Sequence, residues 1–130
     1  MTSFTLYSMP SSGNSYKVRL MMALTGRTYR HAPLEANSAE LEAAKAADAR
    51  PLGKLPVVVP PDGNTLTESG AILWYLSQGT DYQPASALAQ ARALEWMFFE
   101  QNRLEPVIAV RASLNCYPHL ADQATPERME

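Results

Sequence analysis

Short apolar runs with a period of two alternate with longer apolar stretches of helical period through the first part of the chain. Apolar runs bounded by proline, glycine and asparagine predict strands at residues 4–8, 28–34, 55–59 and 65–67. Capping residues followed by periodic apolar positions predict helices at 16–25, 38–48 and 71–78, with Asn14 or Ser15 capping the first and Ser38 the second. The order β-α-β-α-β-β-α predicts an α/β domain with a four-stranded mixed sheet and helices on both faces.

A second pattern follows residues 80–85, which have the composition of a linker. Ser86 is expected to cap a long helix, whose broad apolar face carries Leu94, Met97, Phe98, Gln101 and Leu104. Pro106 is expected to kink this helix, because proline lacks a backbone donor and clashes with the preceding turn. The tail from Tyr117, which contains two prolines, is expected to fray. The predicted domains are residues 1–80 and a truncated, all-helical segment at 86–130.

The composition of the chain excludes several classes of partner and of chemistry. Eleven basic and thirteen acidic side chains give a net charge of −2 without a Lys/Arg cluster, so no nucleic acid is expected as a partner. No apolar stretch approaches the ~18–20 residues of a membrane span, and no signal peptide is visible, so we expect a cytoplasmic protein without a membrane partner. Cys116 is the only cysteine, which excludes an internal disulfide and dithiol exchange. His31 and His119 have no plausible metal partners, so no metal site is expected.

Three short segments carry the candidate chemistry, at residues 11–14, 54–56 and 68–69. Each falls where a strand ends or a helix begins, and open α/β sheets usually bind ligands at such places. Ser12 stands just before the first helix, where its hydroxyl and the helix dipole would stabilise a thiolate. Taken alone, Ser11 and Ser12 fit the roles of loop and capping residues equally well.

The other two segments also have ordinary structural interpretations. Pro56 fits a trans proline at a sheet edge, as most X-Pro bonds are trans. A cis bond would instead turn the backbone of Leu55 outward, where its N–H and C=O could pair with an extended peptide ligand. Glu68 and Ser69 form either a capping pair or a site whose free N–H groups bind a carboxylate and whose side-chain carboxylate binds an ammonium group.

The order and spacing of these segments resemble the N-terminal domain of the glutathione S-transferase superfamily. The match consists of a serine-bearing loop at 11–15, Lys-Leu-Pro-Val at 54–57 and Glu-Ser-Gly-Ala-Ile-Leu-x-Tyr-Leu at 68–76. It looks closest to bacterial members and to the serine-dependent classes. It runs from residue 4 to 79 and continues through RALEWMFFEQNRLEPVIAVR, which looks like the first long helix of the family's second domain. The resemblance implies a thioredoxin-like fold, usually followed by more helices than this chain has.

The resemblance also implies how glutathione, as co-substrate and without a metal, is held. It implies that Leu55 pairs by its backbone with the cysteinyl part next to a cis Pro56. Glu68 and Ser69 would hold the γ-glutamyl end, and Lys54 could reach the glycine carboxylate.

By motif alignment, Ser12 is the serine that stabilises the thiolate, and it is the predicted catalytic residue. Ser11 is the fallback. Asn14 stands where some relatives have a cysteine, and the resemblance implies that it assists Ser12. Because no cysteine lies at 11–15, a thiol-dependent reductase or isomerase is disfavoured.

The sequence therefore predicts a glutathione transferase that joins the glutathione thiolate to a small hydrophobic electrophile. The alternative is a non-catalytic glutathione-binding or dimerisation module derived from the same fold, which the shortened helical segment favours. In either case we expect a homodimer through the helix that begins at Ser86, since a chain of 130 residues cannot surround all the apolar surface of that helix.

Overall fold

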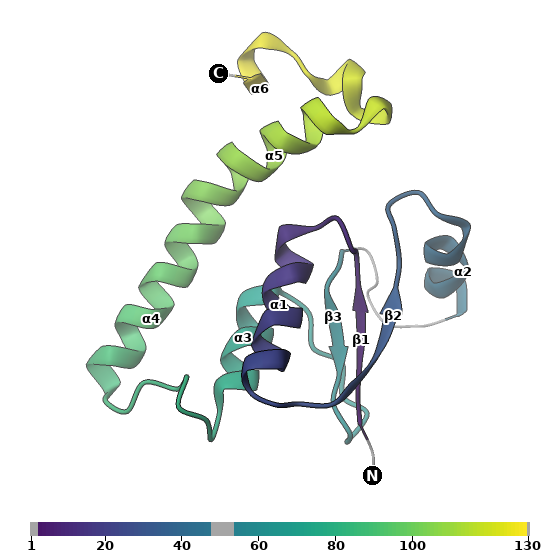
Figure 1. The fold of residues 1–130 in the computed structure, drawn as a ribbon. Helices are drawn as coiled ribbons and strands as arrows, with labels where there is room; N and C mark the ends of the chain where they lie inside the picture. Colours follow the sequence, from purple (N-terminus) through teal and green to yellow (C-terminus); the bar gives the residue numbers. More distant parts are fainter. Residues whose placement is uncertain (1–2, 48–53, 130) are drawn as a thin grey trace. The chain divides into compact units, whose positions relative to one another are not determined.

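A computed structural model describes residues 3–47 and 54–129 of the chain (Figure 1). The chain divides into two compact units, Met1–Gln83 and Pro84–Glu130. The first unit contains, in chain order, β1 (Phe4–Ser8), α1 (Gly13–Leu24), β2 (Tyr29–Pro33), α2 (Ala39–Ala47), β3 (Val57–Val59) and α3 (Ser69–Ser77).

The sheet of the first unit is mixed and has the strand order β2-β1-β3 among the described residues. β1 pairs in parallel with β2, from Phe4 opposite Tyr29, and antiparallel with β3, where Tyr7 lies opposite Val57. The prediction of four strands is wrong in this detail. The segment 65–67 pairs only at Leu66, which exchanges two backbone hydrogen bonds with Val58 at 3.0 and 2.8 Å. The pairing stops there because the chain turns into α3 two residues later.

One apolar cluster holds this unit together. Side chains from the sheet and from two helices are fully buried against one another: Leu6, Val58, Val18, Met22, Ile72 and Leu76. Thus α1 and α3 pack on the same face of the sheet, while α2 lies away from them, beyond β2 (Figure 1). Burying such a side chain contributes roughly 1.5–3 kcal/mol, so this cluster holds α1 and α3 against the sheet.

Helix α1 begins earlier than its sequence predicts. Its N-cap is Ser12, with extended backbone angles, and the Ser12 hydroxyl accepts a hydrogen bond from the amide of Ser15 at 3.3 Å. Capping by Asn14 or Ser15 is therefore wrong, because Gly13 already adopts the helical conformation and both residues lie inside the first turn. The Ser15 side chain turns back and accepts from the Met9 amide at 3.0 Å.

The second unit is helical and comprises α4 (Ala87–Phe99), the π-helical segment η1 (Glu100–Leu104), α5 (Glu105–Cys116), the 3-10 helix η2 (Pro118–Gln123) and α6 (Pro126–Met129). The irregularity predicted at Pro106 takes the form of η1, directly before it. Pro106 offers no amide to the carbonyl four residues earlier, and a wider π turn accommodates that loss.

The tail does not fray as predicted. Pro118 and Pro126 are the first residues of η2 and α6, where a helix needs no backbone donor, so these prolines start short helices instead of preventing them. No helix in the described part of the chain has the length and apolar character needed to cross a membrane. Within residues 3–47 and 54–129, no three His, Cys, Asp or Glu side chains gather in a way that would hold a metal ion.

Candidate site at the amino ends of α1 and α3

The loop that joins β1 to α1 is fixed mainly by side chains outside it. Within the loop, the amide of Ser12 donates to the carbonyl of Met9 at 3.1 Å. From α1, the Arg19 guanidinium reaches back: Nη1 donates to Ser8 Oγ at 3.1 Å and to the Met9 carbonyl at 3.3 Å, and Nη2 donates to the Pro10 carbonyl at 3.1 Å. Three acceptors in successive residues are thus bound by one side chain.

Ser8, one of the partners of Arg19, is a fully buried polar residue at the end of β1. Its hydroxyl lies 2.7 Å from Nε2 of His31, on the neighbouring strand β2. Since a guanidinium can only donate, Ser8 Oγ accepts from Arg19, and the direction of its hydrogen bond with His31 depends on the imidazole tautomer. The buried hydroxyl therefore connects α1, β1 and β2.

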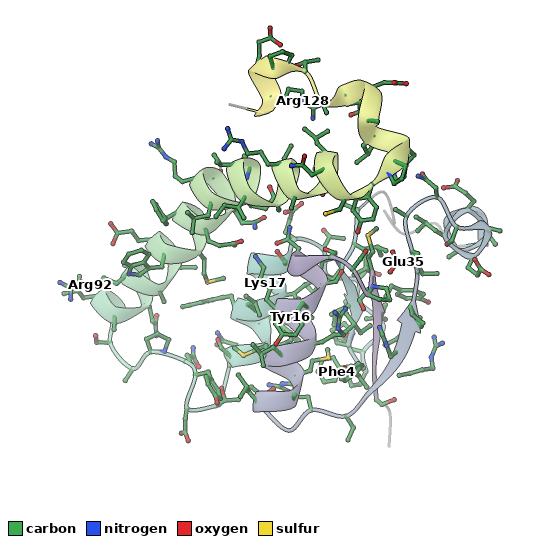
Figure 2. The ribbon with its side chains drawn as sticks, turned by 45° about the horizontal axis from the view of Figure 1, so that its top comes forward. Phe4, Tyr16, Lys17, Glu35, Arg92 and Arg128 are labelled. Carbon is green, nitrogen blue, oxygen red and sulfur yellow. The ribbon has the colours of Figure 1, made fainter. Side chains whose placement is uncertain are left out.

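Glu35, which follows β2, also binds this loop (Figure 2). Its carboxylate accepts from the amide of Ser11 at 3.2 Å and from the Ser11 hydroxyl at 3.0 Å. The single hydroxyl hydrogen of Ser11 is therefore donated to Glu35. The half-buried Ser12 hydroxyl accepts from Ser15, and its own hydrogen is directed to no other described residue.

Helix α3 begins beside α1. The Ser69 hydroxyl, almost fully buried, donates to Oδ1 of Asn14 at 3.1 Å. Glu68, the N-cap of α3, has a φ of +63° and makes no capping hydrogen bond with its side chain. The interpretation of Glu68 as a side-chain cap is therefore wrong, and its carboxylate lies exposed at the start of the helix.

The third segment enters at the same edge of the sheet. Tyr7 lies opposite Val57 in an antiparallel pair, so the residues just before β3 lie level with the loop that leaves β1. The Leu55–Pro56 peptide bond is cis. Among the residues that the structure describes, none forms a hydrogen bond with the main chain of Leu55. Lys54 is exposed.

The structure thus brings the three predicted segments to one edge of the first unit. It joins Asn14 directly to Ser69 and places Ser12 one residue before α1. Two helix amino ends meeting at one place favour a negatively charged ligand, because their unpaired N–H groups and dipoles point toward it.

Sequence reasoning missed two residues of this arrangement, Arg19 and Glu35. A charged residue inside the otherwise apolar stretch Val18–Leu24 was a usable signal for Arg19, since such a side chain needs a partner. Glu35 gave no signal, because its contact with Ser11 spans 24 residues of sequence.

A family model described as "Glutathione S-transferase, N-terminal domain" matches residues 2–78, more than half of the chain. The chain belongs to the glutathione S-transferase family. This confirms the resemblance that its motifs suggested, and the thioredoxin-like arrangement of its first unit is that of the glutathione S-transferase fold.

Solved structures of glutathione S-transferases agree with this assignment. The chain is 36% identical to a glutathione S-transferase from Xanthobacter autotrophicus Py2, with a TM-score of 0.83, and it covers 98% of its own length and 62% of that chain. It is 38% identical to a possible glutathione S-transferase from Rhodopseudomonas palustris, with a TM-score of 0.83, over 97% of its own length and 57% of that chain. The structure of Ure2p in complex with glutathione is 25% identical, with a TM-score of 0.79, over 99% of this chain and 56% of that one.

Among curated proteins, the chain is 31% identical to maleylacetoacetate isomerase from Rhizobium meliloti (strain 1021) over 105 residues, which is 78% of this chain and 49% of that protein. The curated relatives are considerably longer: the chain spans between 24% and 49% of their lengths.

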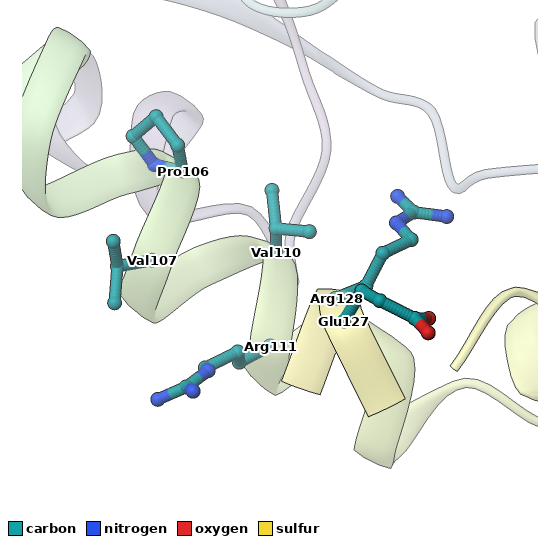
Figure 3. Close-up of a pocket in the computed structure, with 6 residues that line it drawn as sticks. All are labelled: Pro106, Val107, Val110, Arg111, Glu127 and Arg128. Atoms are coloured by element: carbon teal, nitrogen blue, oxygen red, sulfur yellow. The ribbon is translucent and has the colours of Figure 1, made fainter. Parts of the chain in front are cut away.

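The second unit has a pocket of its own, about 290 Å³ in volume, lined by Pro106, Val107, Val110, Arg111, Glu127 and Arg128 (Figure 3). The guanidinium groups of Arg111 and Arg128 point in different directions, and the carboxylate of Glu127 points away from Arg111 (Figure 3). The amide of Glu127 itself and the Thr125 hydroxyl lower the pKa of that carboxyl, so it stays ionised. This pocket therefore lacks the convergent charge that would select an anionic ligand.

Proposed function

We propose that this protein binds glutathione at the joined amino ends of α1 and α3 and activates its thiol. The observation that carries the proposal is the hydrogen bond from Ser69 to Asn14, which holds both helix ends at one place. A tripeptide with two carboxylates and a thiolate suits two adjacent helix amino ends. That Ure2p binds glutathione with a related fold supports the same ligand.

In this proposal each part of glutathione has a partner. The main chain of Leu55 pairs with the cysteinyl residue, next to Pro56. The carboxylate of Glu68 binds the γ-glutamyl ammonium group, and the amide of Ser69 binds its carboxylate. Lys54 takes the glycine carboxylate.

Ser12 is the proposed catalytic residue. Its hydroxyl donates to the glutathione sulfur and stabilises the thiolate, which is the nucleophile. The contact of Ser11 with Glu35 supports this choice over Ser11, because a hydroxyl that already donates to a carboxylate is not available to the sulfur. Asn14, at the same helix end, assists in binding.

The proposed reaction is conjugation. The sulfur lone pair of the thiolate forms a bond to an electrophilic carbon of a small hydrophobic substrate, and the leaving group departs with its electron pair. Thiolate stabilisation and proximity are sufficient for this step, so no metal or redox cofactor is needed. We further propose a cytoplasmic location, in line with the sequence.

A second candidate is a non-catalytic glutathione-binding or dimerisation module. The exposed apolar side chains of the second unit favour it, among them Leu88 (64% exposed), Trp96 (69%) and Phe98 (62%). In both candidates we propose a homodimer in which α4 is a principal contact, since exposed apolar patches of this kind usually mark interfaces.

Titration calorimetry with glutathione, followed by turnover assays with an aryl halide, tests the proposal. Binding with turnover supports the transferase, and binding without turnover supports the non-catalytic module. Absence of binding by the wild-type protein contradicts the transferase and the glutathione-binding module, and leaves only the dimerisation module.

A further inference from the structure

The β1–α1 loop carries Ser12 but contains little that would fix it. Inside the loop, only the hydrogen bond from the Ser12 amide to the Met9 carbonyl is present among the described residues. Every other polar contact of residues 9–11 goes to a side chain outside the loop, and two of those side chains are charged.

We propose that Arg19 and Glu35 are positioning residues that aim the Ser12 hydroxyl at the sulfur of glutathione, one holding the β1–α1 loop from α1 and the other from the chain that follows β2. This inference rests on the proposed glutathione site and adds two residues to it. Neither residue is placed in contact with the ligand.

Arg19 determines the path of the loop before Ser12. The planar guanidinium presents several donors in a fixed fork, and here the fork binds the hydroxyl of Ser8 and the carbonyls of Met9 and Pro10. The anchor at Ser8 is fully buried and also forms a hydrogen bond with His31, which fixes the position of this end of the fork. Lysine, with one ammonium group, cannot reproduce the fork.

Glu35 determines the path of the loop at Ser11, the residue immediately before Ser12. Its two oxygens bind the amide and the hydroxyl of Ser11, which fixes that residue at both its main chain and its side chain. Charge-assisted hydrogen bonds of this kind are stronger than neutral ones. They also keep the hydroxyl of Ser11 away from the sulfur.

The experiment measures the pKa of the glutathione thiol in its complex with the protein, from the ultraviolet absorbance of the thiolate as a function of pH. It needs no electrophile. We expect Arg19→Ala to raise this pKa by about one unit, which is about a tenfold loss of thiolate at a pH below both values. Arg19→Lys should show a smaller rise, and it carries the test if Arg19→Ala does not fold.

Arg27 provides a matched control. Its guanidinium also binds main-chain carbonyls, those of Leu76 and Gln78 at the end of α3, but it does not contact the β1–α1 loop. We expect Arg27→Ala to lower stability and to leave the thiol pKa unchanged. Glu35→Ala should also raise the thiol pKa and so reduce the thiolate fraction several-fold at a pH below that pKa. Its control is Glu40→Ala, on the exposed first turn of α2.

A double-mutant cycle separates positioning from general stability. If Arg19 acts through Ser12, then Arg19→Ala has little further effect on the thiol pKa in a Ser12→Ala background. Equal effects in both backgrounds, or an unchanged pKa in Arg19→Ala and Arg19→Lys, would overturn the inference while leaving the glutathione site in place. If the wild-type protein does not bind glutathione, the proposed function fails and the inference fails with it.

Discussion

The Ser69 hydroxyl donates to Oδ1 of Asn14 at 3.1 Å and thereby connects the first turns of α3 and α1, 55 residues apart in sequence. Ser69 is almost fully buried and Asn14 is half-buried, so this contact is partly shielded from water. A partly shielded hydrogen bond between two helix ends fixes their separation, which is the dimension that a ligand bound to both ends must match.

The first prediction concerns this hydrogen bond. Ser69→Ala and Asn14→Ala should each weaken glutathione binding, and their effects should not add, because each substitution removes the same contact. We expect a coupling energy of about 0.5–1.5 kcal/mol. Titration calorimetry on the two single variants and the double variant measures it. Full additivity would mean that the two helix ends bind the ligand independently.

The second prediction assigns the serine. Ser12→Ala should lower transferase turnover by roughly ten- to a hundred-fold, since a hydrogen bond to a charged group contributes about 1.5–3 kcal/mol. Ser11→Ala should have a smaller effect, because the amide of Ser11 still binds Glu35. Turnover and the thiol pKa of bound glutathione are measured for both variants. An inactive Ser11→Ala beside a fully active Ser12→Ala would shift the assignment by one residue.

The third prediction concerns Glu68, where one substitution should raise the stability of the protein and weaken glutathione binding. Its φ of +63° is unfavourable for a residue with a Cβ atom, so Glu68→Gly should raise the free energy of unfolding by about 1 kcal/mol. The same change removes the carboxylate proposed to bind ammonium, so glutathione affinity should fall about tenfold. Urea unfolding and calorimetry provide the two values.

Asn37 is the control for this substitution, with a φ of +59° and no proposed role in binding. Asn37→Gly should raise the free energy of unfolding only slightly, because asparagine already tolerates this conformation. It should leave the affinity for glutathione unchanged. An unchanged affinity in Glu68→Gly as well would remove Glu68 from the site.

The fourth prediction concerns the opposite end of the first unit. Arg27 donates from Nε and Nη2 to the Leu76 carbonyl at 3.3 and 3.1 Å, and its guanidinium lies 5.5 Å from the centre of the Phe4 ring. Arg27→Ala should therefore reduce the free energy of unfolding by about 1–3 kcal/mol. Arg30→Ala, on the exposed face of β2, should cost much less in the same urea experiment.

The fifth prediction concerns assembly. Light scattering at low micromolar concentration should give twice the chain mass of 14.3 kDa. Phe98→Glu should shift the mass toward one chain, because it places a charge on an exposed aromatic position of α4. Arg92→Glu should leave the dimer intact, because the helical period places Arg92 about 120° from Phe98 around the axis of α4. A concentration-independent mass of one chain for the wild type would contradict the proposed dimer.

Local features could be predicted from the sequence. Ser38 and Ser86 bind the amides of Leu41 and Ala89 at 3.1 and 3.2 Å, which confirms both as caps, because a cap depends only on the next three residues. The disturbance before Pro106 is equally local. The element order also followed from periodicity, since the buried face of each helix repeats within a few residues.

Contacts between distant residues could not be predicted in this way. The partners of Ser11 and Asn14 lie 24 and 55 residues away, and which carboxylate or hydroxyl meets them depends on how the sheet is assembled. The predicted fourth strand is reduced to a single paired residue for a related reason. A run of three residues meets the pattern of a strand, but the turn into α3 leaves only Leu66 to pair.

The π-helical segment η1 changes what the long helical region can present to a neighbour. A π turn inserts one extra residue, and each residue advances an α-helix by about 100°, so positions after η1 are rotated by that angle relative to those before it. This rotation brings Trp96 and Phe99, which touch edge to face, to within about 20° of Ile108 and Val107, respectively, so these exposed side chains form one stripe across η1. A neighbour that covers Trp96 and Phe99 on α4 would consequently also meet Val107 and Ile108 on α5.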